Sequence, residues 1–324
     1  MQSHAIGDSR LRNNGFDESF LNPPVTRPNK PTYGLFRLAD GVSLAYQEFG
    51  SPRGFPVFYL HSTGGSRLEC AFFDQSARKL GFRLIAVDRP GIGYSDFKNL
   101  TSLSEFAGNL LELANALKIP RFGLMSFSSG GMFALATAVK VPERVAFQLN
   151  LGSVSGNLLQ ESMLRNKPCR AYLLQTLVPS CVRLITRLRH TLTPTGPLDY
   201  IARLQEILCY TDRKILAEPK YMEILETSLA ESLRQGIDGV AQDASLCFIN
   251  PGFALEDVKV PVYIWQGTAD TLNSPLSAEY LASKIPGSNY RAVPHGGYFF
   301  FVHCMDEIFS RVQFQAENLQ YAAA

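Results

Sequence analysis

Phe122–Leu135 of this 324-residue chain have the sequence FGLMSFSSGGMFAL. The stretch begins as an apolar strand, passes through small residues and continues as an apolar helix. A strand that turns sharply into a helix crowds its corner residue, so the residues two positions away on either side must be small. Ser128 occupies the corner, between Ser126 and Gly130. The pattern predicts a nucleophile elbow, which lifts a serine hydroxyl above the sheet and leaves adjacent backbone N–H groups free.

Ser126 stands where the usual elbow pattern has its first glycine, so the motif here is small-x-Ser-x-Gly. A second interpretation is a Ser/Gly-rich loop between a strand and a helix, which any α/β protein can contain. A short motif is a hypothesis until its context supports it, and the rest of the chain provides that context.

Length and composition favour a globular enzyme. A chain of 324 residues fits one domain with a large insertion, and 46% hydrophobic with 19% charged residues is ordinary for such a protein. The net charge of +2 gives no reason to expect nucleic acid or an acidic membrane surface as a partner. No apolar run is long enough to span a bilayer, and residues 1–20 lack an apolar core. We therefore expect no integral membrane segment, no secretory signal and a cytoplasmic location.

The six cysteines are scattered and lie mostly among apolar residues. Their spacing matches neither a metal site nor a dense disulfide framework, which predicts reduced and largely buried thiols. The segment Gly91-Ile92-Gly93 lacks the third glycine of a dinucleotide-binding loop, and no helix begins there. We expect no metal and no cofactor.

Three regions follow from the pattern along the chain. Residues 1–30 are polar and proline-rich, which predicts a flexible N-terminal arm. Residues 31–154 and 252–318 alternate strands with helices, which predicts an α/β core with a mostly parallel sheet covered on both faces. Residues 155–251 contain no convincing strand and predict an inserted helical cap.

The individual elements are predicted from apolar periodicity and turn residues. Predicted strands of the core, including a hairpin, are Tyr33–Gly50, Phe55–Leu60, Phe82–Val87, Arg144–Leu151, Val260–Trp265 and Tyr290–Val293. Predicted helices of the core are Leu68–Leu80, Leu103–Leu117, Ser277–Lys284 and Met305–Gln315. Predicted helices of the cap are Ala171–Leu188, Leu198–Cys209 and Met222–Leu233.

An elbow serine needs a base, a carboxylate that orients the base, and N–H donors for the oxyanion. Asp270 lies in Gly267-Thr268-Ala269-Asp270, directly after a predicted strand. The carboxyl ends of parallel strands are where open sheets build their sites, so Asp270 is the candidate acid. The other interpretation is a turn-forming aspartate, which could follow any strand.

Four segments together resemble the α/β-hydrolase superfamily from about Tyr33 to Gln315. They are His61-Ser62-Thr63-Gly64-Gly65-Ser66-Arg67, Asp88-Arg89-Pro90-Gly91-Ile92-Gly93-Tyr94-Ser95, the elbow, and Gly267-Thr268-Ala269-Asp270. The resemblance is to the capped branch that includes epoxide hydrolases, haloperoxidases, esterases and C–C bond hydrolases. A serine at position 128 excludes the members that use an aspartate nucleophile.

The resemblance implies roles for several backbone and side-chain groups. The oxyanion donors are expected to be the backbone N–H groups of Thr63 and Ser129. His61 is expected to shape its loop, although Ser62 replaces the glycine usually found after this histidine. Asp88 and Arg89 are expected to hold their loop in place. The candidate residues for contact with substrate are His61, Ser62, Tyr94 and Tyr298.

The general base is the open question. The family usually places the histidine after two small residues and before an aromatic one, and this chain has Val293-Pro294-His295-Gly296-Gly297-Tyr298-Phe299. Counting without a gap puts Tyr298 in the place of the histidine, and tyrosine, with a pKa of about 10, is a poor base. Either the loop is reshaped so that His295 reaches Ser128, or the base is absent. We take His295 as the candidate base, giving a predicted triad of Ser128, Asp270 and His295.

The predicted cap is rich in apolar residues, which suits a hydrophobic small-molecule substrate. We expect a serine hydrolase that acts on an ester, lactone or related acyl compound through an acyl-enzyme. One alternative is a non-hydrolytic enzyme on the same scaffold, such as a lyase, cyclase or isomerase of secondary metabolism. Another is a catalytically silent small-molecule-binding protein. The sequence leaves the substrate and the oligomeric state open.

Overall fold

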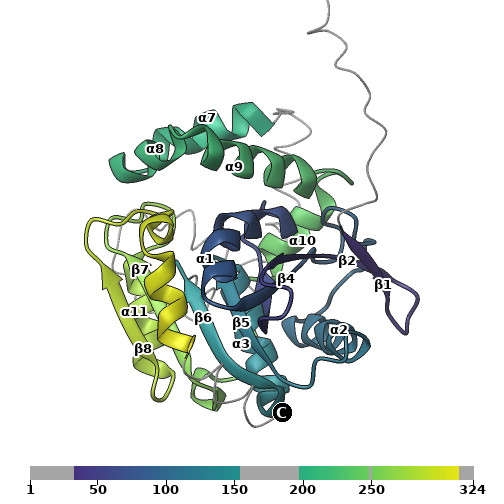
Figure 1. Cartoon of the computed structure of the whole chain (residues 1–324). Coiled ribbons are helices and arrows are strands. Elements are labelled where there is room, and N and C mark those ends of the chain that lie inside the picture. The colour runs from purple at the N-terminus through teal and green to yellow at the C-terminus, as the bar shows by residue number, and fades with distance from the viewer. Residues whose placement is uncertain (1–32, 154–196, 248–249, 314–324) are drawn as a thin grey trace, which may run out of the picture. The chain divides into compact units, whose positions relative to one another are not determined.

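The computed structural model describes residues 33–153, 197–247 and 250–313. Within these residues a single 8-stranded sheet has the strand order β1-β2-β4-β3-β5-β6-β7-β8 (Figure 1). Strand β1 pairs antiparallel with β2, and β2 pairs antiparallel with β4, whereas every later pair is parallel. The strands are β1 (Gly34–Arg37), β2 (Ser43–Gly50), β3 (Phe55–Leu60), β4 (Phe82–Val87), β5 (Phe122–Phe127), β6 (Val145–Leu151), β7 (Val262–Gly267) and β8 (Asn289–Val293). The expectation of a mostly parallel α/β sheet is confirmed.

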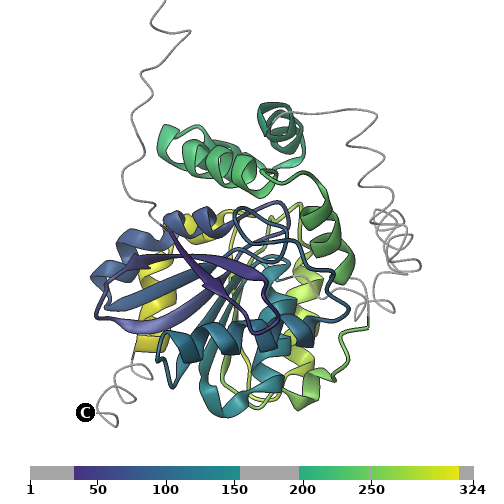
Figure 2. The ribbon, with the colours of Figure 1, turned by 90° about the vertical axis from the view of Figure 1, so that its right-hand side faces the viewer.

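Helices cover both faces of this sheet (Figures 1 and 2). They are α1 (Asp74–Lys79), α2 (Leu103–Ala116), α3 (Gly130–Lys140), α11 (Pro275–Lys284) and a helix over residues 305–313. Side chains of a strand alternate between faces. In β3, Phe58 and Leu60 join the core under α2, α3 and α11, whereas Val57 and Tyr59 join the core under α1 and residues 305–313.

The segment after β3 differs from its predicted helix. Instead of one α-helix over Leu68–Leu80, the chain forms the 3-10 helix η2 (Arg67–Phe73) and then the short α1. Ser66 caps η2, since its hydroxyl oxygen accepts from the N–H of Leu68. Glu69 and Cys70 of η2 are buried along with its two phenylalanines, so tertiary packing, rather than helix periodicity, determines this segment.

Residues 197–247 form four helices, and no strand occurs among them. They are α7 (Pro197–Ile207), α8 (Tyr210–Leu216), α9 (Pro219–Ser232) and α10 (Asp238–Leu246). Helices α7 and α9 match two predicted cap helices, whereas α8 and α10 were not predicted. The predicted arm, residues 1–30, and the predicted helix Ala171–Leu188 lie outside the described residues.

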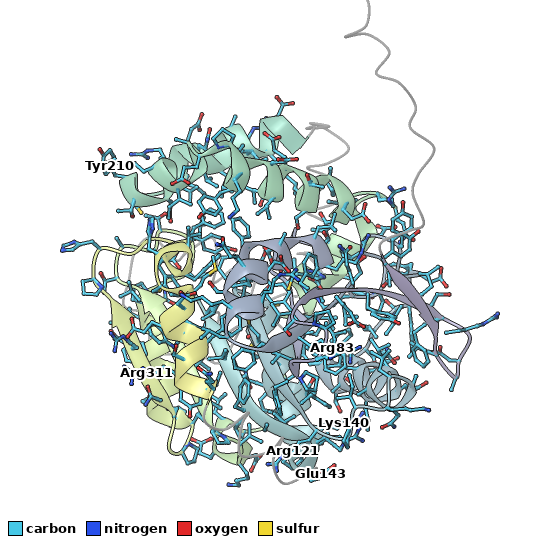
Figure 3. The ribbon with its side chains drawn as sticks, in the orientation of Figure 1. Arg83, Arg121, Lys140, Glu143, Tyr210 and Arg311 are labelled. Carbon is cyan, nitrogen blue, oxygen red and sulfur yellow. The ribbon has the colours of Figure 1, made fainter. Side chains whose placement is uncertain are left out.

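The carboxyl ends of the parallel strands face α7–α9 (Figures 1 and 2). The residues labelled Arg121, Lys140 and Glu143 in Figure 3 lie at the opposite end of the sheet. Ser128 follows β5, Asp270 follows β7, and Tyr298 lies in the segment after β8. The fold therefore brings the candidate residues to one edge of the sheet, beneath the inserted helices.

Candidate active site

Ser128 has the backbone geometry of an elbow. Its φ angle is +53°, in the left-handed region that a residue with a side chain seldom adopts. A Cβ atom added to Gly130 would lie 2.2 Å from the carbonyl oxygen of Leu60, so only glycine fits there. The turn from β5 into α3 thus depends on a small residue at position 130, as the sequence predicted.

The surroundings of Ser126 show how the fold accommodates a serine in place of the first glycine of the motif. Its side chain is fully buried, and its hydroxyl donates to the carbonyl oxygen of Leu149 at 3.3 Å and to Asn150 Oδ1 at 3.2 Å. The neighbouring strand β6 therefore accommodates this hydroxyl with hydrogen bonds. The substitution leaves the elbow intact.

Two backbone N–H groups next to Ser128 remain available. Among the described residues, no hydrogen bond uses the N–H of Thr63 or of Ser129 as its donor. The loops that contain them are joined, because Thr63 Oγ1 donates to Ser129 Oγ at 2.7 Å. These are the two groups that the resemblance suggested as oxyanion donors.

Asp270 is held by its own turn. Its Oδ1 accepts from the N–H groups of Leu272 and Asn273, each at 2.9 Å, and its Oδ2 accepts from Gln266 Nε2 at 3.0 Å. Burial raises the pKa of Asp270 to about 6, against the lowering effect of these hydrogen bonds. The carboxylate orients Asn273, and none of its hydrogen bonds in the described chain goes to a histidine.

Within the described residues, an amide and a phenol interact with the Ser128 hydroxyl. Asn273 Nδ2 donates to Ser128 Oγ at 3.1 Å. The phenol of Tyr298 interacts with the hydroxyls of Ser128 and Ser62. Burial raises the pKa of Tyr298 well above its usual range, and the negative charge of Glu69 raises it further. Tyr298 therefore lies next to Ser128, as the gap-free count of the sequence suggested.

The structure does not bring His295 to Ser128. Its side chain is exposed, and its φ angle is +58°. Its backbone N–H donates to Thr268 Oγ1 at 2.9 Å, and its carbonyl oxygen accepts from Thr211 Oγ1 at 3.2 Å. The hydrogen bonds of Ser128 and Asp270 within the described residues do not include His295, so the predicted triad is not assembled.

His61, Asp88 and Arg89 form a buried scaffold. The His61 ring lies 2.8 Å from the Ser62 carbonyl oxygen through Nδ1, and its Nε2 accepts from the Arg89 N–H at 3.4 Å. Burial and the charge of Arg89 lower the pKa of His61 well below its usual value, so the ring is neutral. Asp88 binds the backbone and guanidinium of Arg67. These residues hold their loops, as the resemblance implied, and His61 does not contact the pocket described below.

Tyr94 is also placed away from the pocket. Its ring stacks on Tyr33 with 4.3 Å between centroids, and the guanidinium of Arg234 lies 4.1 Å from its centroid. Arg67 is near both rings. Tyr94 therefore belongs to an aromatic and arginine cluster rather than to the substrate-contacting set that the sequence suggested.

Glu69 is a buried carboxylate next to this site. Its Oε2 accepts from Tyr59 Oη and from the Ser62 N–H, both at 2.8 Å, and its Oε1 accepts from Ser62 Oγ at 2.6 Å. Burial raises its pKa, while these hydrogen bonds lower it. Ser62, which replaces a glycine of the family pattern, therefore supplies two of the three hydrogen bonds that hold Glu69.

Helix α8 fixes the loop that holds Tyr298. The buried carboxylate of Asp212 accepts from the N–H groups of Tyr298 and Phe299, each at 2.8 Å. A Cβ atom on Gly297 would lie 2.1 Å from Asp212 Oδ2, so glycine is required for this approach. The helices inserted into the core therefore position a residue that contacts Ser128.

A partly open pocket lies beside these residues, and its empty space of about 420 Å³ includes volume that is open to solvent. Its wall combines polar groups from the loop after β3 with apolar side chains of α7 and α9. The lining residues are Ser62, Thr63, Gly64, Gly65, Glu69, Tyr200, Leu204, Leu225, Ser228, Leu229, Leu272, Tyr298 and Phe299. A concave surface that combines apolar side chains with several polar groups is suited to binding a small molecule.

Sequence reasoning missed Asn273, Glu69 and Asp212. Asn273 lies three positions after Asp270, and an Asp-x-x-Asn turn was the available signal. Glu69 stood inside a predicted helix, where acidic residues are usually exposed. Asp212 stood in a cap segment for which no helix was predicted.

Among the described residues, no group of three His, Cys, Asp or Glu side chains could hold a metal ion, and no helix has the length and apolarity to cross a membrane.

With this geometry in place, comparison with known proteins gives the family. The family model described as alpha/beta hydrolase fold matches residues 56–303. The chain belongs to this family. The α/β-hydrolase match covers the elbow, Asp270 and Tyr298, and it includes residues 197–247.

Relatives within the α/β-hydrolase family are named enzymes. A 2-hydroxy-6-oxononadienedioate/2-hydroxy-6-oxononatrienedioate hydrolase of Cupriavidus pinatubonensis is 34% identical over 105 residues, which span 31% of this chain and 36% of that protein. A putative 2-succinyl-6-hydroxy-2,4-cyclohexadiene-1-carboxylate synthase of Bacillus subtilis is 24% identical over 81% of this chain and 90% of that protein. The solved structure of a Pseudomonas aeruginosa hydrolase superposes with a TM-score of 0.67 at 18% identity, covering 89% of this chain and 99% of that chain. These comparisons support an enzyme of the α/β-hydrolase fold.

Proposed function

We propose that this protein is a serine hydrolase that acts on the acyl carbon of a small, largely apolar ester or lactone. The observation that carries the proposal is the strained backbone of Ser128, with a φ angle of +53°. It lies next to the N–H groups of Thr63 and Ser129, which donate to no other described residue. Strain of this kind is maintained where a function needs it. Ser128 attacks the carbonyl carbon, and the two N–H groups stabilise the oxyanion that forms.

The pocket supports an apolar acyl substrate. Leu204, Leu225 and Leu229 of the inserted helices face polar groups from the loop after β3. An apolar chain can pack against the leucines while its carbonyl oxygen reaches the donors at Thr63. The relative from Cupriavidus pinatubonensis, named as a hydrolase, favours the same reaction class.

Covalent labelling tests the nucleophile. A fluorophosphonate probe is expected to add one mass equivalent to the wild-type protein and none to Ser128→Ala, as measured by intact-protein mass spectrometry. A panel of aryl esters and lactones with increasing acyl length then identifies the substrate class. Labelling of Ser128→Ala at the wild-type rate would contradict the assignment of the nucleophile.

A second candidate is a non-hydrolytic lyase, cyclase or isomerase, favoured by one observation. In the part of the chain that the structure describes, the groups that interact with the Ser128 hydroxyl are the amide of Asn273 and the phenol of Tyr298, and neither is an imidazole. Two N–H donors and a nearby phenol can stabilise an enolate without an acyl-enzyme. The relative from Bacillus subtilis that is named a putative synthase matches most of the chain. Turnover of a metabolite by protein that the probe does not label would favour this candidate, whereas tight binding without turnover would indicate a binding protein.

A further inference from the structure

Arg89 binds the peptide group that carries one of the two proposed oxyanion donors. Its Nη2 donates to the carbonyl oxygen of Ser62 at 3.2 Å, and its Nη1 donates to that of His61 at 2.7 Å. The Ser62 carbonyl and the Thr63 N–H belong to the same peptide group. The guanidinium therefore contacts one end of a group whose other end lies beside Ser128.

The same hydrogen bonds fix the direction in which the Thr63 N–H points. The C=O and N–H of a trans peptide group point in opposite directions, and the described chain contains no cis peptide bond. The carbonyls of His61 and Ser62 both point at the guanidinium, so the N–H of each of these peptide groups points away from it. The first of these, the Ser62 N–H, accordingly donates at 2.8 Å to Glu69, which lines the pocket. The second, the Thr63 N–H, is directed to the same side.

Two further donors act on the Ser62 carbonyl oxygen. His61 Nδ1 lies 2.8 Å from it and donates, because a carbonyl oxygen only accepts, and the Gly65 N–H donates at 3.1 Å. Hydrogen bonds to a carbonyl oxygen draw electron density toward it and make the N–H of the same peptide group a stronger donor. A charged donor has the larger effect. The Ser62–Thr63 peptide group is therefore polarised in the sense that stabilises a negative charge at the Thr63 N–H.

The charge of Arg89 is buried and held in place. Its side chain is 1% exposed, and Nε and Nη2 form a two-pronged ion pair with the carboxylate of Asp243 on α10. Nη1 and the second N–H of Nη2 are left for the two carbonyls. Burial reduces screening by solvent, so the charge acts strongly on a peptide group that it touches. Neutral donors could fasten the same carbonyls without the free-energy cost of burying an ion pair, so the charge itself calls for a role.

We propose that Arg89 is a positioning residue, which aims and strengthens the oxyanion donor of Thr63 through the Ser62–Thr63 peptide group. This inference rests on the proposed function. When negative charge develops on the carbonyl oxygen of the acyl substrate, the Thr63 N–H meets it with a peptide group already bound to a cation. Arg89 acts only through this peptide group and exchanges no proton with the substrate.

The test removes the cation together with its partner, so that no buried charge is left unpaired. The double variant Arg89→Met with Asp243→Asn is labelled with the fluorophosphonate probe at Ser128. The second-order labelling rate is expected to fall roughly tenfold, a part of the about 10²- to 10³-fold that loss of a whole oxyanion donor costs. Thermal melting confirms that the variant is folded.

A second ion pair of the same shape provides the matched control. Arg83 donates to Glu48 through Nε at 2.7 Å and Nη2 at 2.6 Å, in a fork like that of Arg89. Arg83, labelled in Figure 3, is near the amino end of β4, whereas Arg89 comes just after the carboxyl end of that strand. The control Arg83→Met with Glu48→Gln is expected to label at the wild-type rate.

A spectroscopic readout separates polarisation from a structural role. In the labelled protein the phosphoryl oxygen of the adduct stands in for the oxyanion, and hydrogen bonds to it withdraw electron density from phosphorus. The ³¹P resonance of the wild-type adduct is therefore expected downfield of the same adduct in urea-unfolded protein. In the double variant it is expected to move toward the unfolded position. A loop that is only less stable would label more slowly but leave the resonance of the folded adduct in place.

The outcomes are distinguishable. A folded double variant whose adduct keeps the wild-type ³¹P position overturns the role of Arg89 and leaves Ser128 as the nucleophile. A control that shifts as far as the double variant overturns it as well. If the double variant does not fold, Arg89→Lys decides, because its ammonium keeps the charge but cannot bind both carbonyls and Asp243 as the fork does. An intermediate shift then supports the role, and an unshifted resonance overturns it. A wild-type protein that is never labelled overturns the proposed function and this inference together.

Discussion

Asn273 Nδ2 lies 3.1 Å from Ser128 Oγ and 2.8 Å from the carbonyl oxygen of Gly152, so one amide joins the elbow to the end of β6. Asp270 holds that amide in place by accepting from the backbone N–H of Asn273. The carboxylate that the sequence suggested as the partner of a histidine thus acts on Ser128 through an asparagine. The Ser128 hydroxyl is held by this amide and also interacts with the phenol of Tyr298.

The first prediction concerns this amide. Asn273→Ala leaves the Gly152 carbonyl oxygen without a partner and frees the Ser128 side chain to rotate. We expect a loss of about 1–3 kcal/mol in the free energy of unfolding and a roughly tenfold slower labelling of Ser128. Chemical denaturation and labelling kinetics measure the two effects. The control Asn289→Ala changes an exposed residue of β8, and equal effects in both variants would contradict the assigned role.

The second prediction concerns the elbow glycine. A Cβ atom at position 130 would lie 2.2 Å from the Leu60 carbonyl oxygen, a backbone atom that cannot move aside. We expect Gly130→Ala to lower the free energy of unfolding by more than about 3 kcal/mol or to prevent folding. The matched change Gly108→Ala, inside α2, meets only the end of the Lys140 side chain and is expected to be neutral or to stabilise by up to about 1 kcal/mol. Equal stability of the two variants would contradict the packing at the elbow.

Features that depend only on residues close together in the sequence can be predicted from it. The elbow, the strand Phe82–Val87 and the turn at Asp270 are encoded within a few residues, and the structure contains all three. The expected sheet followed from the alternation of strands and helices. Its order could not be read from the chain, because pairs such as β3 with β5 join segments that are distant in sequence.

The arrangement around Ser128 was harder to predict because its side chains come from separate segments. A gap-free count placed Tyr298 in the position of the histidine, but only the fold determines which side chain reaches Ser128. Asp212 accepts a hydrogen bond from the N–H of Tyr298, which lies 86 residues further along the chain. A local sequence pattern does not reveal such a contact. Ser62 was noted as a departure from the family pattern, although its partner Glu69 was not recognised.

The third prediction is a pH dependence of stability. Burial raises the folded-state pKa of Asp270 from 3.8 to about 6, so between these values the folded protein keeps a proton that the unfolded chain has lost. The free energy of unfolding therefore falls as pH rises from about 4 to about 6 and is level above that range. Relative to Asp270→Asn, the fall is expected to be on the order of 3 kcal/mol. Denaturant melts of both proteins from pH 4 to pH 8 measure it, and a constant difference would contradict the prediction.

The fourth prediction concerns Asp212. Asp212→Asn keeps the volume of the side chain but replaces one of the two oxygens that accept from the N–H groups of Tyr298 and Phe299. We expect a loss of about 1–3 kcal/mol in the free energy of unfolding, because a buried donor is left unpaired. Labelling of Ser128 should also slow, since Tyr298 shifts. The control Asp199→Asn alters an exposed residue of α7, and a Ser128 labelling rate in Asp212→Asn that equals that of this control would show that Tyr298 is held by other contacts.

The position of Asp212 on an inserted helix limits which other helices could replace this insertion. Inserted helices are attractive units to exchange between relatives, because they form much of the pocket wall and so influence which substrate is accepted. Here one of these helices, α8, supplies Asp212, which accepts from the backbone N–H of Tyr298. Gly297 has no side chain, which leaves room for the Asp212 carboxylate. A transplanted insertion that lacks this carboxylate would change selectivity and reactivity together. Under the proposed function, the choice of substrate and the reaction at Ser128 would therefore depend on the same inserted helices.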